Sequence, residues 1–439
     1  MTAALPAPAD MLLALPINGE SFLLRRAGKN VLVDGGYKKD KIARVLERHI
    51  RDVQYLDIVV CTHGDRDHVG GLPALLEDWV DRVGQLWLPG RWVNVVPQLA
   101  RDPAGFFNQL VRELDAELRN PSEETISVVR HADDEEVQHD NWQGIVSLPE
   151  AYDIEPTVAW TDGCDRSLDP EEILPEPEWF DTLRQAEDDL ASDDATIRAL
   201  KSVRRRVMYR QKRLASDLEI QITHFWLDLI ETAQAIRKLA VAAIRQRIPT
   251  RWFDFERFAE TRQAAGGVHG FLVPINAVEQ ATPPTNLARF MHLTQINRES
   301  LVFLAPPAKE RLGVLFCADS PLGDGPSYCR SFLPTLSLPM PWLPIVATAP
   351  HHGSETNKAA YAHLHEWAPV AVLLRAGGNI KQPGSTFLSQ HSCLRLCTKC
   401  PKARLSPMLS GVFLSYPSWH PSQLIALGRR CDCSYSRRP

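Results

Sequence analysis

The N-terminal part of the chain consists of short apolar runs separated by polar turns and one amphipathic stretch. Residues 11–36 contain the apolar runs MLLALPI, FLLRR and NVLVDGG, with glycines in the connecting segments. This pattern predicts an antiparallel meander of strands. Residues 38–50 carry apolar side chains at helical spacing, and LDIVV, PALLEDWV and QLWLPG then indicate strand, helix and strand. The alternation predicts an α/β fold, with residues 11–100 as the first half of one domain.

The middle of the chain has a helical pattern. AGFFNQLVRELDAEL is amphipathic with a helical period, and residues 130–178 are acidic and irregular. No Pro or Gly stands between Trp179 and Ile248. Long stretches without these two residues favour helices. We therefore expect residues 101–250 to form a long helical insertion.

Strand-like runs return after the helical pattern. RWFDF, GFLVPI, SLVFLA, GVLFCAD, LPIVATA and VAVLLRA are short apolar runs of the kind that form strands. We expect residues 251–383 to form the second half of the α/β domain. The periodicity then weakens, and residues 384–439 have the composition of a Cys-rich tail.

Composition narrows the class of protein. The chain has 439 residues, 44% of them hydrophobic, so it is long enough to bury a large core. The net charge of −5 gives no overall signature of nucleic-acid binding. A net charge describes the whole chain and not local patches of basic side chains. The N-terminus has no basic segment, and no run approaches the roughly 18 apolar residues of a membrane span. We expect a soluble cytoplasmic protein with no membrane partner.

Four apolar runs end in an acid or an imidazole followed by small residues. NVLVDGG ends in Asp34, and LDIVV leads into a cluster that begins at His63. GVLFCADS ends in Asp319, and LPIVATAPHHGS ends in His351 and His352. Strands place such groups at one edge of a sheet, where acids repel one another unless a cation lies between them. The pattern therefore predicts a metal centre.

The spacing within CTHGDRDHVGG suits two cations. His63 and Asp65 are two residues apart and point the same way in an extended segment. Asp67 and His68 are adjacent, and a turn at the following glycines lets both face a second ion. Mixed imidazole and carboxylate ligands suit Zn²⁺, Mn²⁺ or Fe, and two carboxylates favour a harder ion such as Mn²⁺. A polar turn that only caps a helix is the alternative.

These residues also carry a family resemblance. HGDRDH resembles the HxHxDH signature of the metallo-β-lactamase fold, with Asp65 where the second His normally stands. Asp34, Asp319 and His352 resemble other acidic and imidazole positions of that fold, in the same order. The form HxDxDHxGG, with NGESFLL, NRESLVF and APHHGSETN, resembles the metallohydrolase domain of the competence DNA-uptake channel (ComEC-type) proteins. The resemblance implies a four-layer αββα fold and does not cover the helical insertion or the tail.

The resemblance implies a role for each residue. One or two divalent ions, Zn²⁺ or Mn²⁺, are expected on His63, Asp65, Asp67, His68, Asp319 and His352. Asp67 is also expected to orient a metal-bound hydroxide, and Asp319 to bridge the ions. His351 is expected to hold substrate or transfer a proton. Asp34 and Ser354 are expected to support the site without binding metal.

The histidine that usually binds the first ion from the middle of the chain has no clear counterpart. His269 in GGVHGF is a weak candidate, and His131 and His139 are weaker still. An ordinary, partly buried side chain is the alternative for His269.

Two further segments have a composition that could bind a ligand. C-x2-C with a distant second pair is typical of a structural zinc knuckle, and unpaired surface thiols are the alternative for Cys393, Cys397, Cys400, Cys431 and Cys433. The basic run KSVRRRVMYRQKR is more typical of a solvated helix face than of a phosphate-binding surface, since Tyr209 is its only aromatic residue.

The resemblance implies hydrolysis of phosphodiester bonds, by a nuclease or phosphodiesterase, with a nucleic acid or nucleotide as substrate. The motif alone indicates only hydrolysis of an ester, amide or phosphoester, so a small ester, thioester, lactone or lactam remains an alternative. A second alternative is a non-catalytic binding or regulatory module, with the helical insertion as the surface for a protein partner. The absent middle histidine favours that second alternative.

Overall fold

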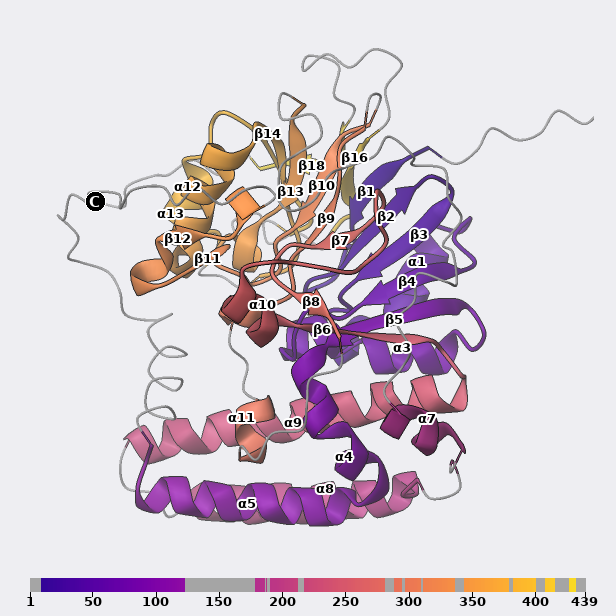
Figure 1. Cartoon of the computed structure of the whole chain (residues 1–439), viewed down its shortest axis with the longest axis vertical. Coiled ribbons are helices and arrows are strands. Elements are labelled where there is room, and N and C mark those ends of the chain that lie inside the picture. Colours follow the sequence, from indigo (N-terminus) through magenta and orange to yellow (C-terminus); the bar gives the residue numbers. More distant parts are fainter. Residues whose placement is uncertain are drawn as a thin grey trace, which may run out of the picture.

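Figure 1 shows the computed structural model of the chain, in which two β-sheets lie against each other and long helices lie below them in that view. The residues that the structure describes are 9–122, 178–185, 187, 190–211, 217–280, 288–293, 297–308, 311–335, 343–378, 382–399, 407–414 and 426–431. The mixture of sheets and helices confirms the predicted α/β class.

The first sheet contains most of the N-terminal strands. Its members among the described residues are β1 (Met11–Ala14), β2 (Phe22–Arg26), β3 (Lys29–Val33), β4 (Leu56–Val60), β5 (Val83–Pro89), β6 (Thr250–Asp254), β8 (Val278–Glu279), β16 (Ser410–Phe413) and β17 (Ala426–Leu427). Their order is β17-β16-β1-β2-β3-β4-β5-β6-β8. β1 to β3 pair antiparallel, which confirms the predicted meander, whereas β3 to β6 are parallel.

The second sheet comes from the C-terminal part of the chain. Its described strands are β7 (Val273–Pro274), β9 (Phe303–Ala305), β10 (Gly313–Phe316), β13 (Ile345–Thr348), β14 (Val370–Arg375), β15 (Leu394–Cys397) and β18 (Arg429–Arg430). Their order is β18-β15-β14-β13-β10-β9-β7, and β10, β13, β14 and β15 are parallel. A separate short hairpin pairs β11 (Gly323–Asp324) with β12 (Arg330–Ser331).

The two sheets share an apolar core. Alternate side chains of a strand point to opposite faces, so each sheet contributes one face to this core. Trp87 on β5, Phe253 on β6 and Phe303 on β9 meet there, with ring centroids between 5.0 and 5.4 Å apart. All three side chains are buried. The sheets are therefore held together largely by apolar contacts between their inner faces.

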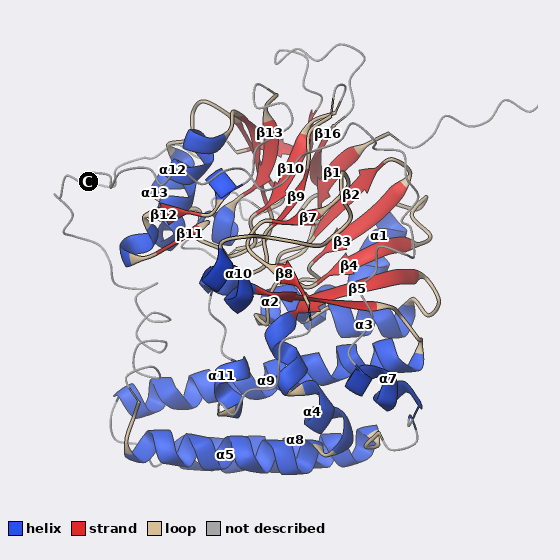
Figure 2. Cartoon of the chain, in the orientation of Figure 1, coloured by secondary structure: helices blue, strands red, loops and turns tan. Residues whose placement is uncertain are grey.

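Helices cover the outer face of each sheet (Figure 2). The first sheet packs against α1 (Ile42–His49) and α3 (Leu72–Asp78), through side chains such as Leu46 and Leu75. The second sheet packs against α10 (Phe255–Thr261), α12 (Lys358–Trp367) and α13 (Ser385–Leu388). Among the described residues, no helix is both long enough and apolar enough to cross a membrane.

A group of helices follows β5 and precedes β6 along the chain. They are α4 (Val96–Arg101), α5 (Pro103–Arg119), α7 (Glu178–Gln185), α8 (Asp193–Gln211) and α9 (Asp217–Arg245). A further short helix, α11 (Arg289–Leu293), packs against α5 and α9. The apolar side of α9 joins the core of the first sheet by way of α3. These helices therefore pack on the sheet domain through a shared apolar core.

Residues after 384 add strands to both sheets. β15 pairs with β14 in the second sheet, and β16 pairs with β1 in the first. The weak periodicity of this region did not indicate these strands. They are short, and their partners lie far away in the sequence, so local pattern carried little signal for them.

Short 3-10 helices connect several strands. Among the described residues they are η1 (Lys38–Asp40), η2 (Gly90–Asn94), η5 (Asn297–Glu299), η6 (Pro326–Tyr328), η7 (Leu333–Thr335), η8 (Pro350–Gly353) and η9 (Glu355–Asn357). Three of them, η5, η8 and η9, lie next to the side chains of the candidate site.

Candidate metal centre

The predicted site residues follow strands of both sheets. Asp34 follows β3 and His63 follows β4, and these two strands are parallel neighbours in the first sheet. Asp319 follows β10, and His351 and His352 follow β13, the parallel neighbour of β10 in the second sheet. Because parallel neighbours end at the same edge, each sheet delivers its acids and imidazoles to one place.

The segment between β4 and α3 turns tightly. It forms the short helix α2 (Arg66–Val69), whose first turn closes by hydrogen bonds of 2.9 Å from the amides of His68 and Val69 to the carbonyl of Asp65. Gly19 packs against the turn, since a Cβ there would lie 2.4 Å from the carbonyl oxygen of Asp67. The turn presents the side chains of residues 63, 65, 67 and 68 to the site.

One group of ligands surrounds one oxygen of Asp319. Nε2 of His63 lies 3.6 Å from Oδ2 of Asp319 and 3.6 Å from Oδ2 of Asp65. Nε2 of His351 lies 3.5 Å from the same Oδ2 of Asp319. His63 and Asp319 are buried, with 5% and 1% of their surface exposed.

A second group lies at the other oxygen of Asp319. Nε2 of His68 is 3.2 Å from Oδ1 of Asp319. Nε2 of His352 is 3.0 Å from Oδ2 of Asp67. The rings of His68 and His352 are neighbours, with centroids 5.4 Å apart. Asp319 therefore lies between two groups, each with imidazole and carboxylate ligands.

Asp34 helps to hold the imidazole ligands in place. Its Oδ2 lies 2.8 Å from Nδ1 of His68 and accepts a hydrogen bond of 2.7 Å from the hydroxyl of Thr62. The same hydroxyl is 3.0 Å from Nδ1 of His63. An Nδ1–H bond to a carboxylate leaves the lone pair of Nε2 of His68 free to face a cation. Asp34 therefore contacts His68 at Nδ1, while Nε2 of the same ring faces Asp319.

The segment after β13 holds two histidines in an uncommon backbone conformation. His351 and His352 both have positive φ angles, of 46° and 53°. Such angles cost energy for residues other than glycine and occur where the surrounding structure enforces them. Nε of Arg375 donates a 2.6 Å hydrogen bond to the carbonyl of His352, and the amide of His351 donates to the carbonyl of Ala318.

Two polar side chains support this segment. Ser354 caps η9, its hydroxyl accepting a hydrogen bond from the amide of Thr356. Asn357 donates a 2.7 Å hydrogen bond to the carbonyl of Asp319 and so joins the His-His segment to the loop after β10. Ser354 thus has a local structural contact, and Asn357 is a supporting residue that the sequence prediction did not include.

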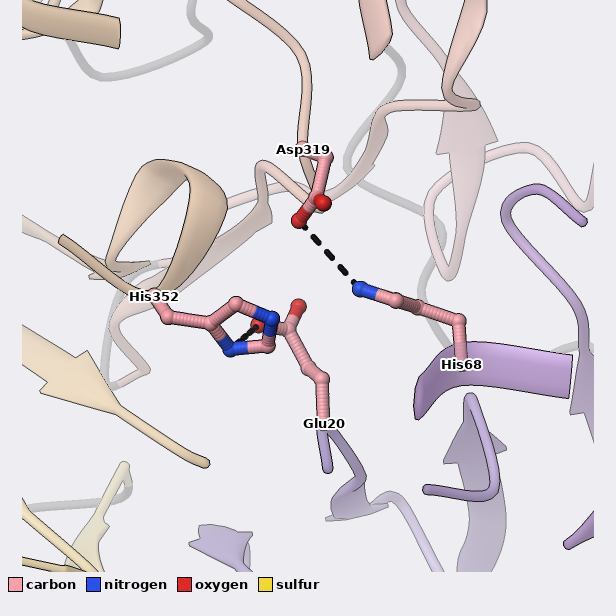
Figure 3. A group of neighbouring side chains, drawn as sticks. All are labelled: Glu20, His68, Asp319 and His352. Atoms are coloured by element: carbon pink, nitrogen blue, oxygen red, sulfur yellow. Dashed lines mark ion pairs between the residues drawn. The ribbon is translucent and has the colours of Figure 1, made fainter. Parts of the chain in front are cut away.

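Glu20 is a further residue that the sequence prediction missed. Figure 3 shows its carboxylate pointing toward the same space as the side chains of His68, Asp319 and His352. Its Oε2 is 3.3 Å from Nδ1 of His352, and that nitrogen also lies 2.9 Å from the carbonyl of Ala376. Glu20 lies two residues before β2, in NGESFLL, and the sequence gives no sign that this acid faces the site.

Charges in the site compensate one another. Burial disfavours protonation of His63, but Asp65 and Asp319 outweigh it and raise its pKa to about 10. Burial acts likewise on His352, and Asp67 outweighs it and raises the pKa to about 9. Burial alone would raise the pKa values of Asp67 and Asp319, yet the histidines around them hold both below the usual range. Both carboxylates are therefore ionised at neutral pH.

Several buried polar atoms of the site have no hydrogen-bond partner. They are Nε2 of His63, Nε2 of His68, Oδ1 of Asp65, Oδ1 of Asp319 and Oε2 of Glu20. Buried polar atoms of native proteins nearly always have a partner. A divalent cation between these nitrogens and oxygens would satisfy several of them together, and imidazole with carboxylate is a donor set that such cations accept. The residues therefore fit one or two divalent cations.

Other predicted candidates lie elsewhere. His269 is exposed and belongs to none of the clusters of possible metal ligands in the part of the chain that the structure describes. His131 and His139 lie outside the described residues, as do Cys400 and Cys433. Of the remaining tail cysteines, Cys397 and Cys431 are buried side by side on β15 and next to β18, and Cys393 is partly buried.

Comparison with known proteins finds a similarity in the N-terminal part. Residues 15–87 match the family model of the metallo-beta-lactamase superfamily. A comparison with curated proteins found no match. A solved structure, a HARLDQ-motif mutant of a metallo-β-lactamase from Cronobacter sakazakii, is similar at 23% identity over 19% of this chain and 31% of that chain, with a TM-score of 0.15. The chain thus spans less than a third of that protein, and a likeness of this extent carries no argument about activity.

Proposed function

We propose that the chain is a metal-dependent hydrolase that cleaves phosphodiester bonds. The observation that supports this most is Asp319, whose two oxygens face two groups of buried imidazole and carboxylate ligands. The match of residues 15–87 to the metallo-beta-lactamase superfamily supports the reaction class, because members of that superfamily are generally hydrolases.

The ligands divide between two cations. His63 and Asp65 would hold the first, and Asp67, His68 and His352 the second, with Asp319 shared. A bound divalent cation supplies Lewis acidity and lowers the pKa of a coordinated water from 15.7 to roughly 7. The ionised carboxylate of Asp67 would orient a water at the site through a hydrogen bond. Asp34 holds His68 in the tautomer whose Nε2 lone pair faces the site.

The donor set favours a phosphate ester as substrate. Three of the ligands are carboxylates, which suit hard ions such as Mn²⁺, and phosphate oxygens are hard ligands for the same ions. Arg298 on η5 has a half-exposed side chain. It follows Asn297, whose Nδ2 is 3.4 Å from Nδ1 of His351. A cation at this place can contact a phosphate that is bound at the site.

The experiment is a cleavage assay with purified protein and Mn²⁺ or Zn²⁺, on bis-p-nitrophenyl phosphate, single-stranded DNA, RNA and cyclic nucleotides. The double variant Asp67→Ala with Asp319→Ala is expected to lose all metal-dependent cleavage. Asp78→Ala serves as the matched control, because Asp78 is an exposed acid at the end of α3. Undiminished cleavage by the double variant would contradict the proposal.

The same assay distinguishes the other reactions. A thioester, a lactone and a lactam are tested in parallel. Turnover of one of these, with none of the phosphodiesters, assigns the site to carbonyl chemistry. Turnover of none, together with no bound Zn, Mn or Fe and no gain in stability on adding them, would instead support a non-catalytic module.

The proposal extends to the arrangement of the fold. We propose that the two sheets and their outer helices form the four-layer αββα arrangement, and the apolar cores around and between the sheets support this. The helices between β5 and β6 would be an insertion into it, available to a protein partner. The similarity to the DNA-uptake type of domain, carried by the HxDxDHxGG form, favours a nucleic acid or nucleotide as substrate.

A further inference from the structure

The two groups of ligands at Asp319 are unequal when only the predicted metal residues are counted. The second group has two imidazoles, from His68 and His352. The first has one, from His63, with the carboxylate of Asp65 beside it. His269, the sequence candidate for the absent imidazole, is exposed and belongs to neither group. The first group therefore has one imidazole fewer than the second.

His351 occupies the place of that missing imidazole. Its Nε2 lies 3.5 Å from Oδ2 of Asp319, and Nε2 of His63 lies 3.6 Å from the same oxygen. Two imidazole nitrogens thus face one carboxylate oxygen at nearly the same distance. We propose that His351 is the fourth protein ligand of the first cation, with His63, Asp65 and Asp319, and replaces the middle histidine in this chain.

The spacing of the atoms fits coordination better than hydrogen bonding. Distances of 3.5 and 3.6 Å exceed those of ordinary N–H···O hydrogen bonds. Two ligands that lie about 2.1 Å from one ion in tetrahedral geometry are about 3.4 Å apart. Three separations agree with this value: those from Nε2 of His63 to the oxygens of Asp65 and Asp319, and that from Nε2 of His351 to the oxygen of Asp319. His63, Asp65 and Asp319 form a cluster of possible ligands within 4.8 Å of one another, and His351 contacts that cluster through Asp319.

The ring of His351 is oriented for this role. Its Nδ1 lies 3.4 Å from the hydroxyl of Thr356 and 3.4 Å from the side-chain amide of Asn297. The Thr356 hydroxyl can accept the Nδ1 proton. The Asn297 amide nitrogen faces the ring, and exchanging the nitrogen and oxygen of that amide lets its oxygen accept the proton as well. With the proton on Nδ1, the lone pair of Nε2 faces Asp319. Metal-binding histidines commonly have their second nitrogen held in this way.

Burial also distinguishes coordination from proton transfer. Only 6% of the surface of His351 is exposed, and its backbone amide donates to the carbonyl of Ala318, the residue before Asp319. His351 has a positive φ, and its ring faces Asp319. A residue that donates a proton to a leaving group needs contact with the substrate, whereas a ligand needs contact with the ion.

The test is the number of cations bound per chain and their dissociation constants, measured by elemental analysis and calorimetry with Mn²⁺ or Zn²⁺ alone. This inference rests on the proposed metal-dependent function, so the wild type is measured first, and two cations per chain are expected. His351→Ala should bind one with normal affinity. The affinity for the other should fall by more than about 100-fold, since loss of an outer-shell partner alone costs 10–100-fold. His351→Asp, which supplies a new ligand, should recover part of the loss.

His363→Gln is the matched control, because His363 is equally buried but bonds to the carbonyl of Tyr328 outside the site. It should bind two cations. If His351→Ala keeps two cations at wild-type affinity and loses only turnover, the inference is wrong and His351 transfers protons. A wild type that binds no cation would overturn the proposed function together with the inference. If the alanine variant does not fold, the number of bound cations and their dissociation constants are measured on His351→Gln, whose side chain is closer in size to histidine. The same loss of affinity for one cation is expected.

Discussion

Asp319 is the residue on which both ligand groups depend. Its oxygens face different histidines, and it follows a strand of the second sheet while His63 and His68 follow a strand of the first. Asn357 fixes its backbone carbonyl. Five acids and four histidines close together would be unstable without compensation, so the charges of neighbours and of a cation determine which form each group has.

At the same scale, Asp34→Asn tests the orientation of His68. The substitution should leave the backbone undisturbed, since Asp34 has a φ of 61° and Asn tolerates that region well. Its amide nitrogen would, however, donate to Nδ1 of His68 and move the ring proton to Nε2. We expect the affinity for the second cation to fall by about 10–100-fold. A metal titration beside Asp78→Asn checks this, and an unchanged dissociation constant would show that the tautomer of His68 is set elsewhere.

The raised pKa of Glu20 predicts that the stability of the fold depends on pH. Burial raises its pKa from 4.5 to about 7, although His68 and His352 partly oppose this. The folded chain therefore keeps the proton longer than the unfolded chain does. The resulting stabilisation is complete below pH 4.5 and is lost as the pH rises through 7.

Glu20→Gln cannot lose a proton, so its stability in EDTA should not show this decline. The difference in free energy of unfolding between variant and wild type should rise by up to about 3 kcal/mol from pH 4.5 to pH 8. Urea denaturation at several pH values measures it. A variant that is less stable than the wild type at pH 8 would indicate that the ionised form of Glu20 is the stabilising one.

At the scale of elements, α9 holds the turn that carries four ligands. The hydroxyl of Thr232 donates a 3.0 Å hydrogen bond to the carbonyl of Gly64, inside that turn. Arg66 of α2 pairs with Asp228 and Glu231 of α9 at 3.1 and 3.0 Å. The helices between β5 and β6 therefore contribute to the position of His63 and Asp65.

Thr232→Val removes this hydrogen bond and keeps the shape of the side chain. We expect a loss of about 1 kcal/mol in the free energy of unfolding and a weaker first cation site, because the turn is less firmly held. Thr232→Ser keeps the hydroxyl and should retain wild-type metal affinity. Equal metal affinity of the Val and Ser variants would mean that α9 does not position the ligands.

At the scale of the molecule, the site exists only where the two sheets meet. His63, Asp65, Asp67 and His68 come from the first sheet, and Asp319, His351 and His352 from the second. A cation bound by residues of both sheets stabilises the packed form over the separated one. Added metal should therefore raise the unfolding midpoint of the whole chain.

Phe303→Ala tests the contact between the sheets. Phe303 packs on Trp87 and Phe253 in the shared core, and its removal should cost about 3–5 kcal/mol. We expect circular dichroism and tryptophan fluorescence to follow one common unfolding transition, shifted to lower urea. Two separate transitions in the variant would show that the sheets unfold independently. Phe255→Leu, on α10 outside this core, is the control.

Local pattern was sufficient for much of the fold and for the candidate residues. Apolar runs predicted β1 to β7, β9, β10, β13 and β14, and acids and histidines after those runs marked the residues that the structure brings together. These features depend on side-chain period and on the chemistry of strand ends, which are properties of a few neighbouring residues. The class of the fold and the presence of a metal-binding motif follow from them.

Long-range packing decided the rest. Glu20 shows nothing unusual in the sequence, and it reaches the site only because the loop between β1 and β2 packs on the turn of Asp67. The roles of His351 and His352 depend on two left-handed backbone conformations, which the contacts of Ala318 and Arg375 accompany. The convergence of Asp319 with His63 requires two sheets whose strands are far apart in the chain. Sequence spacing contains no information on such distances, because they are set by the apolar core that joins the sheets.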